Sequence, residues 1–258
     1  MNAHPPAVVQ RVLQRSAWFS ALPTPLQDVV VRRSTIRTFR RGDSIQREGE
    51  WPREMGFVLS GRVRCLIRCG TERETVAHVG GPGFWFGPAA TFPGAAAFMS
   101  VVADAPTQTM LLPRSEFERI IDEDPRRFRP FSTLAFELLA QLIRYLGELP
   151  GLTLDGVLRV RIADMAERAR RQGGLDGPVE LVLSQADLAS MVGMSRQRLA
   201  QRLRALQQEG LVEPGFRRIV VPDPARLRGS AGVDAHAHAH LAVASRAAVV
   251  PLRRQAER

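Results

Sequence analysis

The sequence predicts an α+β protein in which an N-terminal antiparallel β-roll is joined by a long helix to a small C-terminal domain of helices and strands. Three observations predict this order: short β-rich segments separated by glycines between residues 35 and 112, an apolar repeat of helical period over 125–148, and alternating helices and short strands beyond 152. The 258 residues, 45% of them apolar, suffice for two cores. We place a roll at 1–124, a linking helix at 125–149, a second domain at 150–228 and an Ala-rich tail, expected to be disordered, at 229–258.

Composition excludes several classes of protein and hints at one partner. No apolar run approaches the ~18 residues of a membrane span, and neither collagen nor a wholly disordered chain fits. The 36 basic residues are all arginine and outnumber 26 acidic residues, giving a net charge of +10. Arginine forms paired hydrogen bonds with phosphate and guanine, although exclusive arginine usage also follows from a GC-rich genome. Only Cys65 and Cys69 occur, and the N-terminus lacks a signal-peptide pattern, so we expect a cytoplasmic protein.

The first 124 residues predict helices followed by a roll. Apolar residues recur at helical spacing over 8–31, with breaks near Pro23 and Pro25. Short β-rich runs separated by glycines then favour an antiparallel roll over a βαβ sheet. Ser115, with Glu118 three residues later, predicts a capped short helix that ends near Asp122.

The segment 125–148 predicts one long helix with a dimerisation seam. Apolar residues recur along it with spacings of 4, 3, 4, 3 and 4, as in a coiled coil, at Phe131, Ala135, Leu138, Leu142, Tyr145 and Leu149. A second row is expected to pack on the chain's own core: Leu134, Leu139, Ile143 and Leu146. The alternative is a helix that packs only within its own domain. Pro150-Gly151 predicts a hinge after it.

The strongest local pattern lies at 184–206. Ser184 and Asp187 predict a capping box for one helix, Gly193 suits the positive φ of a tight turn, and Ser195 caps a second helix. The second helix has an apolar face at Leu199, Leu203 and Leu206. Its other face carries the side chains that bind base edges and phosphates in a helix-turn-helix: Ser195, Arg196, Gln197, Arg198, Gln201 and Arg202. An ordinary helical hairpin with a solvated basic face is the alternative.

The flanking segments predict a wing. Residues 210–221 read as a hairpin that pairs with the strand Val179–Leu183, and Arg217 and Arg218 would contact backbone phosphate at its tip. Eight arginines against three acidic residues over 190–230 give a local charge of +5, whereas residues 1–149 carry +4. This concentration of charge is typical of a DNA footprint.

This layout resembles the Crp/Fnr superfamily of transcriptional regulators, the relatives of the cyclic-AMP receptor protein, over roughly residues 17–222. The matching motifs are 57–63 (FVLSGRV), 81–87 (GPGFWFG) and 192–196 (VGMSR). The resemblance implies a cyclic-nucleotide-binding-like roll that senses a signal, a homodimer, RNA polymerase as a partner, and double-stranded DNA with an inverted repeat. It also places a guanine-reading arginine at Arg196, with Glu often at the position of Gln197 and Arg at that of Gln201.

The sequence departs from the family where cyclic-nucleotide binders hold the ligand. In those members the glycine at the position of Gly87 is followed by a Glu that binds the ribose. In this sequence Pro88 stands at that position. Their phosphate-binding Arg is missing too, because the aligned stretch 95–99 is Ala-Ala-Ala-Phe-Met. We therefore expect no cyclic nucleotide. The predicted effector region is apolar and consists of Phe84, Phe86, Gly87, Phe92, Phe98 and Met99. It either holds an apolar or aromatic molecule or is filled by its own side chains.

Other cofactors and activities are not indicated. Iron–sulfur members need N-terminal cysteines, which residues 1–64 lack, and Cys65 and Cys69 lie ~13 Å apart along one extended run. His78 stands alone, so haem is not expected. His236, His238 and His240 alternate in the tail without a fourth ligand. No catalytic motif is present, and we expect a regulator and not an enzyme. The rival interpretation is an effector-binding or protein-interaction module whose basic domain does not read DNA specifically.

Overall fold

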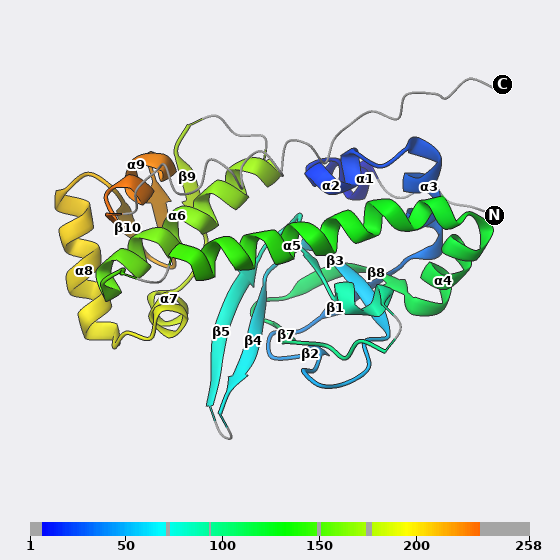
Figure 1. Ribbon diagram of the computed structural model, residues 1–258, viewed down its shortest axis with the longest axis horizontal. Coiled ribbons are helices and arrows are strands. Elements are labelled where there is room, and N and C mark those ends of the chain that lie inside the picture. Colours follow the sequence, from blue (N-terminus) through cyan, green and yellow to red (C-terminus); the bar gives the residue numbers. More distant parts are fainter. Residues whose placement is uncertain (1–6, 71–72, 93, 149–150, 174–176, 233–258) are drawn as a thin grey trace.

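The protein is organised around one long helix. A computed structural model describes residues 7–70, 73–92, 94–148, 151–173 and 177–232. Helix α5 (Phe128–Glu148) runs along the long axis, with the β-roll against its side and the C-terminal domain, here called the head, beyond its end (Figure 1). The hinge residue Pro150 and the histidines of the tail lie outside the described residues. Within those ranges no helix is long and apolar enough to cross a membrane.

The roll consists of two four-stranded antiparallel sheets, which confirms the predicted fold class. One sheet has the order β1-β8-β3-β6 and the other β2-β7-β4-β5. Between them lies a compact apolar core built on side chains such as Val58, Val63, Phe86, Val101 and Leu111. The strands are β1 (Thr35–Phe39), β2 (Ser44–Gln46), β3 (Glu54–Ser60), β4 (Val63–Cys69), β5 (Arg73–Gly80), β6 (Trp85–Phe86), β7 (Ser100–Ala103) and β8 (Thr107–Pro113).

Helices cover the outer face of the first sheet and form a second core there. These are α1 (Ala7–Gln14), α2 (Ala17–Ser20), α3 (Thr24–Arg33) and α4 (Arg114–Glu123). Trp18 and Trp85 pack edge to face with ring centroids 4.6 Å apart. Their indole N–H groups donate to Pro130 O at 2.7 Å and to Ser16 Oγ at 2.9 Å, so neither buried donor lacks an acceptor.

The start of α4 differs from the prediction. Pro113 occupies the N-cap position and makes no side-chain cap, because the end of β8 leads directly into the helix. Ser115 therefore lies inside the first turn. Glu118 binds Arg114 at 2.9 Å instead of completing a capping box.

Helix α5 follows a short 3₁₀ turn, η2 (Pro125–Arg127), and packs its first turns on the roll. Phe131 is 2% exposed and lies edge-on to Trp18 and Phe117, with centroids 5.3 and 4.9 Å away. Its assignment to the dimer seam was wrong, because the aromatic core of the roll takes this side chain. Leu134 is buried in the same core, as the second apolar row predicted.

The head is a winged helix-turn-helix with its own core. Its three-stranded sheet has the order β10-β11-β9, all antiparallel. Leu158, Ile162, Leu188, Leu199 and Ile219 are at most 1% exposed at the centre of the core. The elements are α6 (Leu154–Gly173), β9 (Val179–Leu181), α7 (Gln185–Val192), α8 (Arg196–Gln208), β10 (Glu213–Gly215), β11 (Arg218–Val221) and α9 (Pro224–Gly229).

Candidate nucleic-acid interface and effector region

Local capping positions the two helices of the helix-turn-helix. Ser184 Oγ accepts from Asp187 N at 3.1 Å, and the Asp187 carboxylate accepts from Ser184 N, which completes the predicted capping box of α7. Gly193 ends α7 with φ 68°, where a Cβ would be strained. Ser195 Oγ then accepts from Arg198 N at 3.2 Å and caps α8. These predictions from 184–195 are confirmed, because each depends on contacts within four residues.

Helix α8 divides into a buried and an exposed face. Leu199, Leu203 and Leu206 are at most 1% exposed, as their spacing predicted. The polar side chains predicted to bind DNA all lie on the exposed face. Among the described side chains on this face of α8, Arg202 forms an ion pair with Asp155 at 3.4 Å, and the two side chains are 45% and 29% exposed. The face is therefore free to enter a major groove.

The wing places its two arginines differently. Gly215 and Arg218 close a hairpin whose tip is Phe216 and Arg217, and Arg217 has φ 54°. Arg218 is exposed, and its guanidinium lies 3.6 Å from the Glu180 carboxylate. Arg217 instead reaches Asp104 of the roll at 3.2 Å. The sequence pattern did not indicate this contact, because the two residues are 113 positions apart.

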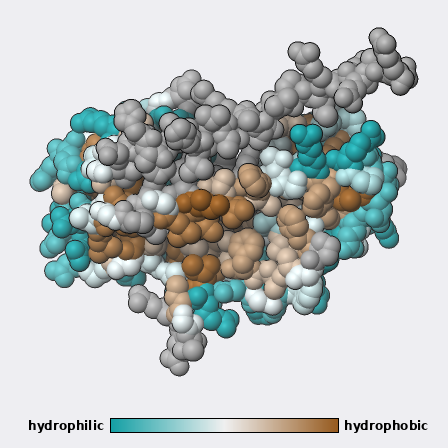
Figure 2. Space-filling view, in the orientation of Figure 1, coloured by the Kyte–Doolittle hydropathy of each residue, from teal (hydrophilic) through white to brown (hydrophobic). Residues whose placement is uncertain are grey.

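An apolar strip on α5 is left uncovered. Figure 2 shows it as a brown band across the middle of the molecule. Five large side chains along it are 49–66% exposed: Phe136, Leu139, Leu142, Ile143 and Leu146. Leu139, Ile143 and Leu146 were expected to pack internally, and that was wrong, because about half of each side chain is exposed, whereas Phe131 and Leu134 of the first turns of α5 enter the core of the roll. Ala135 is partly buried. Leu149 and the side chains of Leu138 and Tyr145 lie outside what the structure describes.

The predicted effector residues do not line one cavity. The ring of Phe86 lies on Gly56, where a Cβ would come within 2.0 Å of it, and the ring of Phe84 lies on Gly80 in the same way. Phe86 and the partly buried Phe84 and Met99 therefore fill the interior of the roll, whereas Phe98 is 54% exposed.

The remaining residues of that set have other roles. Phe92 packs edge to face on Phe128 at 5.8 Å, outside the interior of the roll. Gly87 has φ 71°, and a Cβ there would meet Gln46 Oε1 at 2.8 Å. Burial raises the pKa of the Cys65 thiol to about 12, which keeps this strand residue protonated and apolar.

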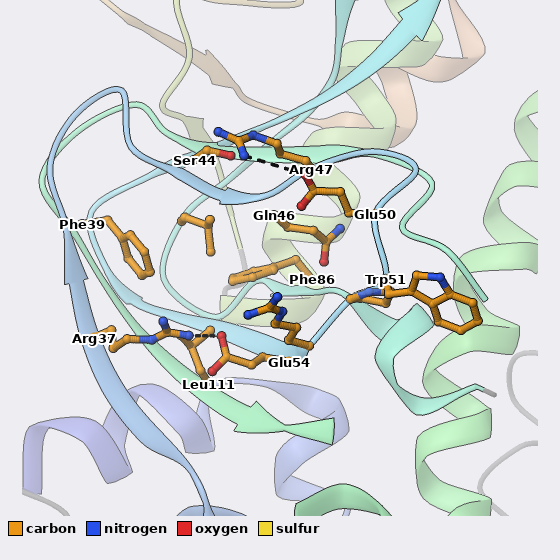
Figure 3. A pocket seen from close by; sticks show the side chains of 13 residues that line it. Arg37, Phe39, Ser44, Gln46, Arg47, Glu50, Trp51, Glu54, Phe86 and Leu111 are labelled. Atoms are coloured by element: carbon orange, nitrogen blue, oxygen red, sulfur yellow. Dashed lines mark hydrogen bonds and ion pairs between the residues drawn. The ribbon is translucent and has the colours of Figure 1, made fainter. Parts of the chain in front are cut away.

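A cavity of about 200 Å³ opens instead at the mouth of the roll (Figure 3). Phe39, Phe86 and Leu111 line it together with the ion pairs Arg37–Glu54 and Arg47–Glu50. Only Phe86 of the predicted effector residues takes part. The lining residues are Arg37, Phe39, Ser44, Ile45, Gln46, Arg47, Glu50, Trp51, Pro52, Arg53, Glu54, Phe86 and Leu111.

His78 lies on β5 in an environment that opposes its charge. Its ring packs against Phe84 with centroids 4.8 Å apart, and among the described residues its buried Nδ1 has no hydrogen-bond partner. Loss of hydration, then the positive charges of Arg168 and Arg161, lower the His78 pKa to about 3. The residue is therefore neutral at physiological pH. The described residues contain no group of three or more His, Cys, Asp or Glu able to hold a metal ion.

A roll, a long helix with an exposed apolar strip, and a winged head with an arginine-rich reading face define a two-domain DNA-binding regulator. Comparison with known families agrees: residues 36–124 match the model of the cyclic nucleotide-binding domain, and residues 140–229 that of the Crp-like helix-turn-helix domain. The chain belongs to the Crp/Fnr family of DNA-binding transcriptional regulators.

Individual relatives match over most of their length. The cyclic AMP receptor protein of Thermus thermophilus is 28% identical over 220 residues, which is 83% of this chain and 96% of the relative. The CRP-like cAMP-activated global transcriptional regulator of Mycobacterium tuberculosis is 20% identical over 219 residues, 85% of this chain and 98% of the relative. The structure of FixK2 from Bradyrhizobium japonicum has a TM-score of 0.66 at 21% identity, covering 78% and 99% of the two chains, and supports the fold.

Proposed function

We propose that this chain is a homodimeric transcription factor that reads an inverted-repeat DNA site and responds to a signal other than a cyclic nucleotide. The observation that best supports sequence-specific DNA binding is that α8 is amphipathic, with an apolar face buried and a polar face exposed. Its leucines are buried in the head, while Arg196, Gln197 and Gln201 are exposed together. Arg recognises guanine and Gln recognises adenine in the major groove. We therefore expect half-sites with a guanine opposite Arg196 and adenines opposite the two glutamines.

The apolar strip on α5 supports the dimer. Exposed apolar patches of this kind mark interfaces, and a partner helix that covers the strip would remove large side chains from water. A two-fold dimer presents two copies of α8, which accounts for an inverted repeat. Contact with RNA polymerase and a cytoplasmic location are parts of the same proposal.

Binding of genomic DNA fragments, measured by gel shift at about 50 mM and 200 mM salt, tests the reading of DNA. Counterion release should weaken binding to all duplexes at higher salt, with a subset of fragments retained. Sequencing of that subset should give an inverted repeat. A duplex of random sequence is the control. Equal retention of all fragments would leave only a basic module without sequence reading.

The roll supports a signal other than a cyclic nucleotide. A buried cyclic phosphate needs a counter-charge, and without one its desolvation costs several kcal/mol. Pro88 and the stretch 95–99 supply neither a cation nor a hydroxyl. The Phe86 ring fills the neighbouring interior of the roll. These residues do not fit the ligand named by the family model and by the relatives.

Titration calorimetry of the full chain with cyclic AMP and cyclic GMP tests this part. We expect no measurable heat of binding up to millimolar nucleotide and no change in DNA affinity. Saturable binding at micromolar concentration would refute the assignment. A matched thermal-shift screen with apolar and aromatic compounds would then seek the signal, since a ligand at 100 times its Kd adds about 2.7 kcal/mol of stability.

A further inference from the structure

The roll and the head meet through a polar surface on one strand of the roll. Thr75 Oγ1, on β5, donates to Ser190 O of α7 at 2.9 Å, and the Val76 amide donates to Ser190 Oγ at 3.2 Å. Arg161 of α6 donates to Ala77 O on the same strand. Backbone and side-chain groups of the roll therefore hold α7, the first helix of the helix-turn-helix.

A buried carboxylate extends this surface to the wing. The Asp104 side chain is 1% exposed and lies 2.5 Å from Arg62, 3.1 Å from Arg64 and 3.2 Å from Arg217. Arg62 and Arg64 belong to the roll, whereas Arg217 is at the tip of the wing. Arg62 and Arg64 already pair the buried carboxylate inside the roll, and Arg217 adds a third guanidinium from the wing, which favours the docked arrangement.

Arg64 connects the two parts. It also contacts Asp187 of α7, with 2.8 Å between Nε and Oδ1, and this carboxylate completes the capping box with Ser184. Arg217, Asp104, Arg64 and Asp187 thus form one continuous charge network from the wing, through the roll, to the start of α7.

This network competes with DNA for the parts of the head that flank α8. In helix-turn-helix proteins the first helix crosses the DNA backbone, and wing arginines bind phosphates. Here the roll covers α7, and Arg217 is paired with Asp104. DNA phosphates would have to replace the Asp104 carboxylate as the partner of Arg217. The reading face of α8 remains exposed. The docked arrangement therefore blocks the contacts of α7 and Arg217 with the DNA phosphates, but it does not cover the residues that read bases.

We propose that the roll–head surface is an intramolecular latch that holds the head in a state of low DNA affinity. The latch opens when Arg217 and α7 lose their contacts with the roll and contact the DNA backbone instead. A signal that moves β4 or β5 would act on DNA binding through this surface. The inference rests on the proposed DNA-binding function and adds its means of regulation.

A reversible crosslink across the latch tests the inference directly. Thr75 Oγ1 and Ser190 Oγ lie 3.1 Å apart, so Thr75→Cys with Ser190→Cys, in a Cys69→Ser background, brings two thiols within disulfide range. After oxidation with oxidised glutathione, we expect at least tenfold weaker binding to a selected genomic site. Dithiothreitol should restore the affinity. The Cys69→Ser parent, treated identically, should not change.

Each outcome decides one point. If the parent binds no DNA, the proposed function fails, and the latch with it. If the parent binds but the oxidised double variant binds equally well, the docked arrangement is competent for DNA and the latch is refuted. If the folded double variant forms no disulfide within the chain, the docked arrangement is not populated, which also refutes the latch.

A second variant opens the latch without a crosslink. Arg64→Ala removes the link to Asp187 but leaves the Arg62–Asp104 pair inside the roll, and we expect DNA affinity to rise by about 5- to 150-fold, the usual range of coupling between sites. Arg68→Ala, the same change of charge on the same strand, should leave it unchanged. Equal or weaker binding by Arg64→Ala would contradict the proposal.

Discussion

Single arginines of the head are expected to differ in what they recognise. Arg196 begins α8 and is exposed, so its guanidinium can meet a base edge, whereas Arg218 lies on the wing beside Glu180. Arg196→Ala should cost about 1–3 kcal/mol of binding free energy and relax the preference at one guanine. Arg218→Ala should weaken all sequences alike and lower the salt slope by about one. Binding to a panel of mutated half-sites measures both effects.

The comparison between the two variants is its own control, because both remove one positive charge. If Arg196→Ala lost affinity uniformly over the panel, as Arg218→Ala should, the assignment of Arg196 to base reading would be abandoned.

His78 should make the stability of the fold depend on pH. Its pKa falls from 6.5 in the unfolded chain to about 3 in the folded one, so the unfolded state binds the proton more readily. This contribution to stability is complete above pH 6.5 and is lost as the pH falls toward 3. Between pH 8 and 5.5 we expect a loss of about 1.4 kcal/mol from His78. Urea denaturation at the two pH values measures it.

The variant His78→Gln, which does not titrate, is the comparison for that measurement. Because all other titratable groups are the same in both proteins, the extra loss in the wild type isolates the histidine. A wild type and variant with the same pH dependence would show that His78 is solvated as in the unfolded chain.

At the scale of elements, α5 is expected to hold the dimer through its exposed strip. Leu142→Glu with Leu146→Glu places charges where a partner helix would pack, yet both side chains are exposed in one chain and contribute little to its own core. We therefore expect a folded monomer with an unchanged unfolding transition at matched concentration, measured by light scattering and circular dichroism. Thr133→Glu, on α5 outside the strip, should remain dimeric. A dimer in the double variant would refute this interface.

The elements differ in how far their sequence determines them. The capping box at Ser184, the turn at Gly193 and the leucine face of α8 follow from contacts within one or two turns, and sequence reasoning finds them. The start of α4 was missed because β8 runs directly into it, which moves the first turn ahead of Ser115. Two apolar rows repeat along α5, and packing on residues distant in the sequence decides which side chains are buried. The repeat alone could not show that Phe131 is buried and Leu142 is exposed.

Contacts between distant segments were the least predictable part of the molecule. Asp104 follows β7, and no local sequence pattern indicates that it forms an ion pair. Its partner Arg217 was predicted to bind DNA phosphate. The effector residues were chosen by alignment of one loop, but the bare backbone of Gly56 and Gly80 on other strands determines where the phenylalanine rings lie. For Phe86 the signal is Gly56, its partner across the β3–β6 pair, which pairing of the strands would have supplied.

At the scale of the whole molecule, the proposed two-fold dimer would fix the spacing of its DNA site. The two copies of α8 must enter successive major grooves on one face of the duplex, so half-sites should lie about one helical turn, ~34 Å, apart. Inserting five base pairs between them adds about half a turn and moves the second half-site to the opposite face. We expect affinity to fall to the non-specific level, about a thousandfold or more, in a gel shift.

Exchange of the central base pairs without a change in length is the matched control for that insertion. It alters the deformability of the duplex but not the relative rotation of the half-sites, so its effect should be limited to a few kcal/mol. Full affinity for the lengthened site would mean that the two heads act independently. The α5 dimer would then be a tether only, and the symmetry of the protein would not be imposed on the DNA.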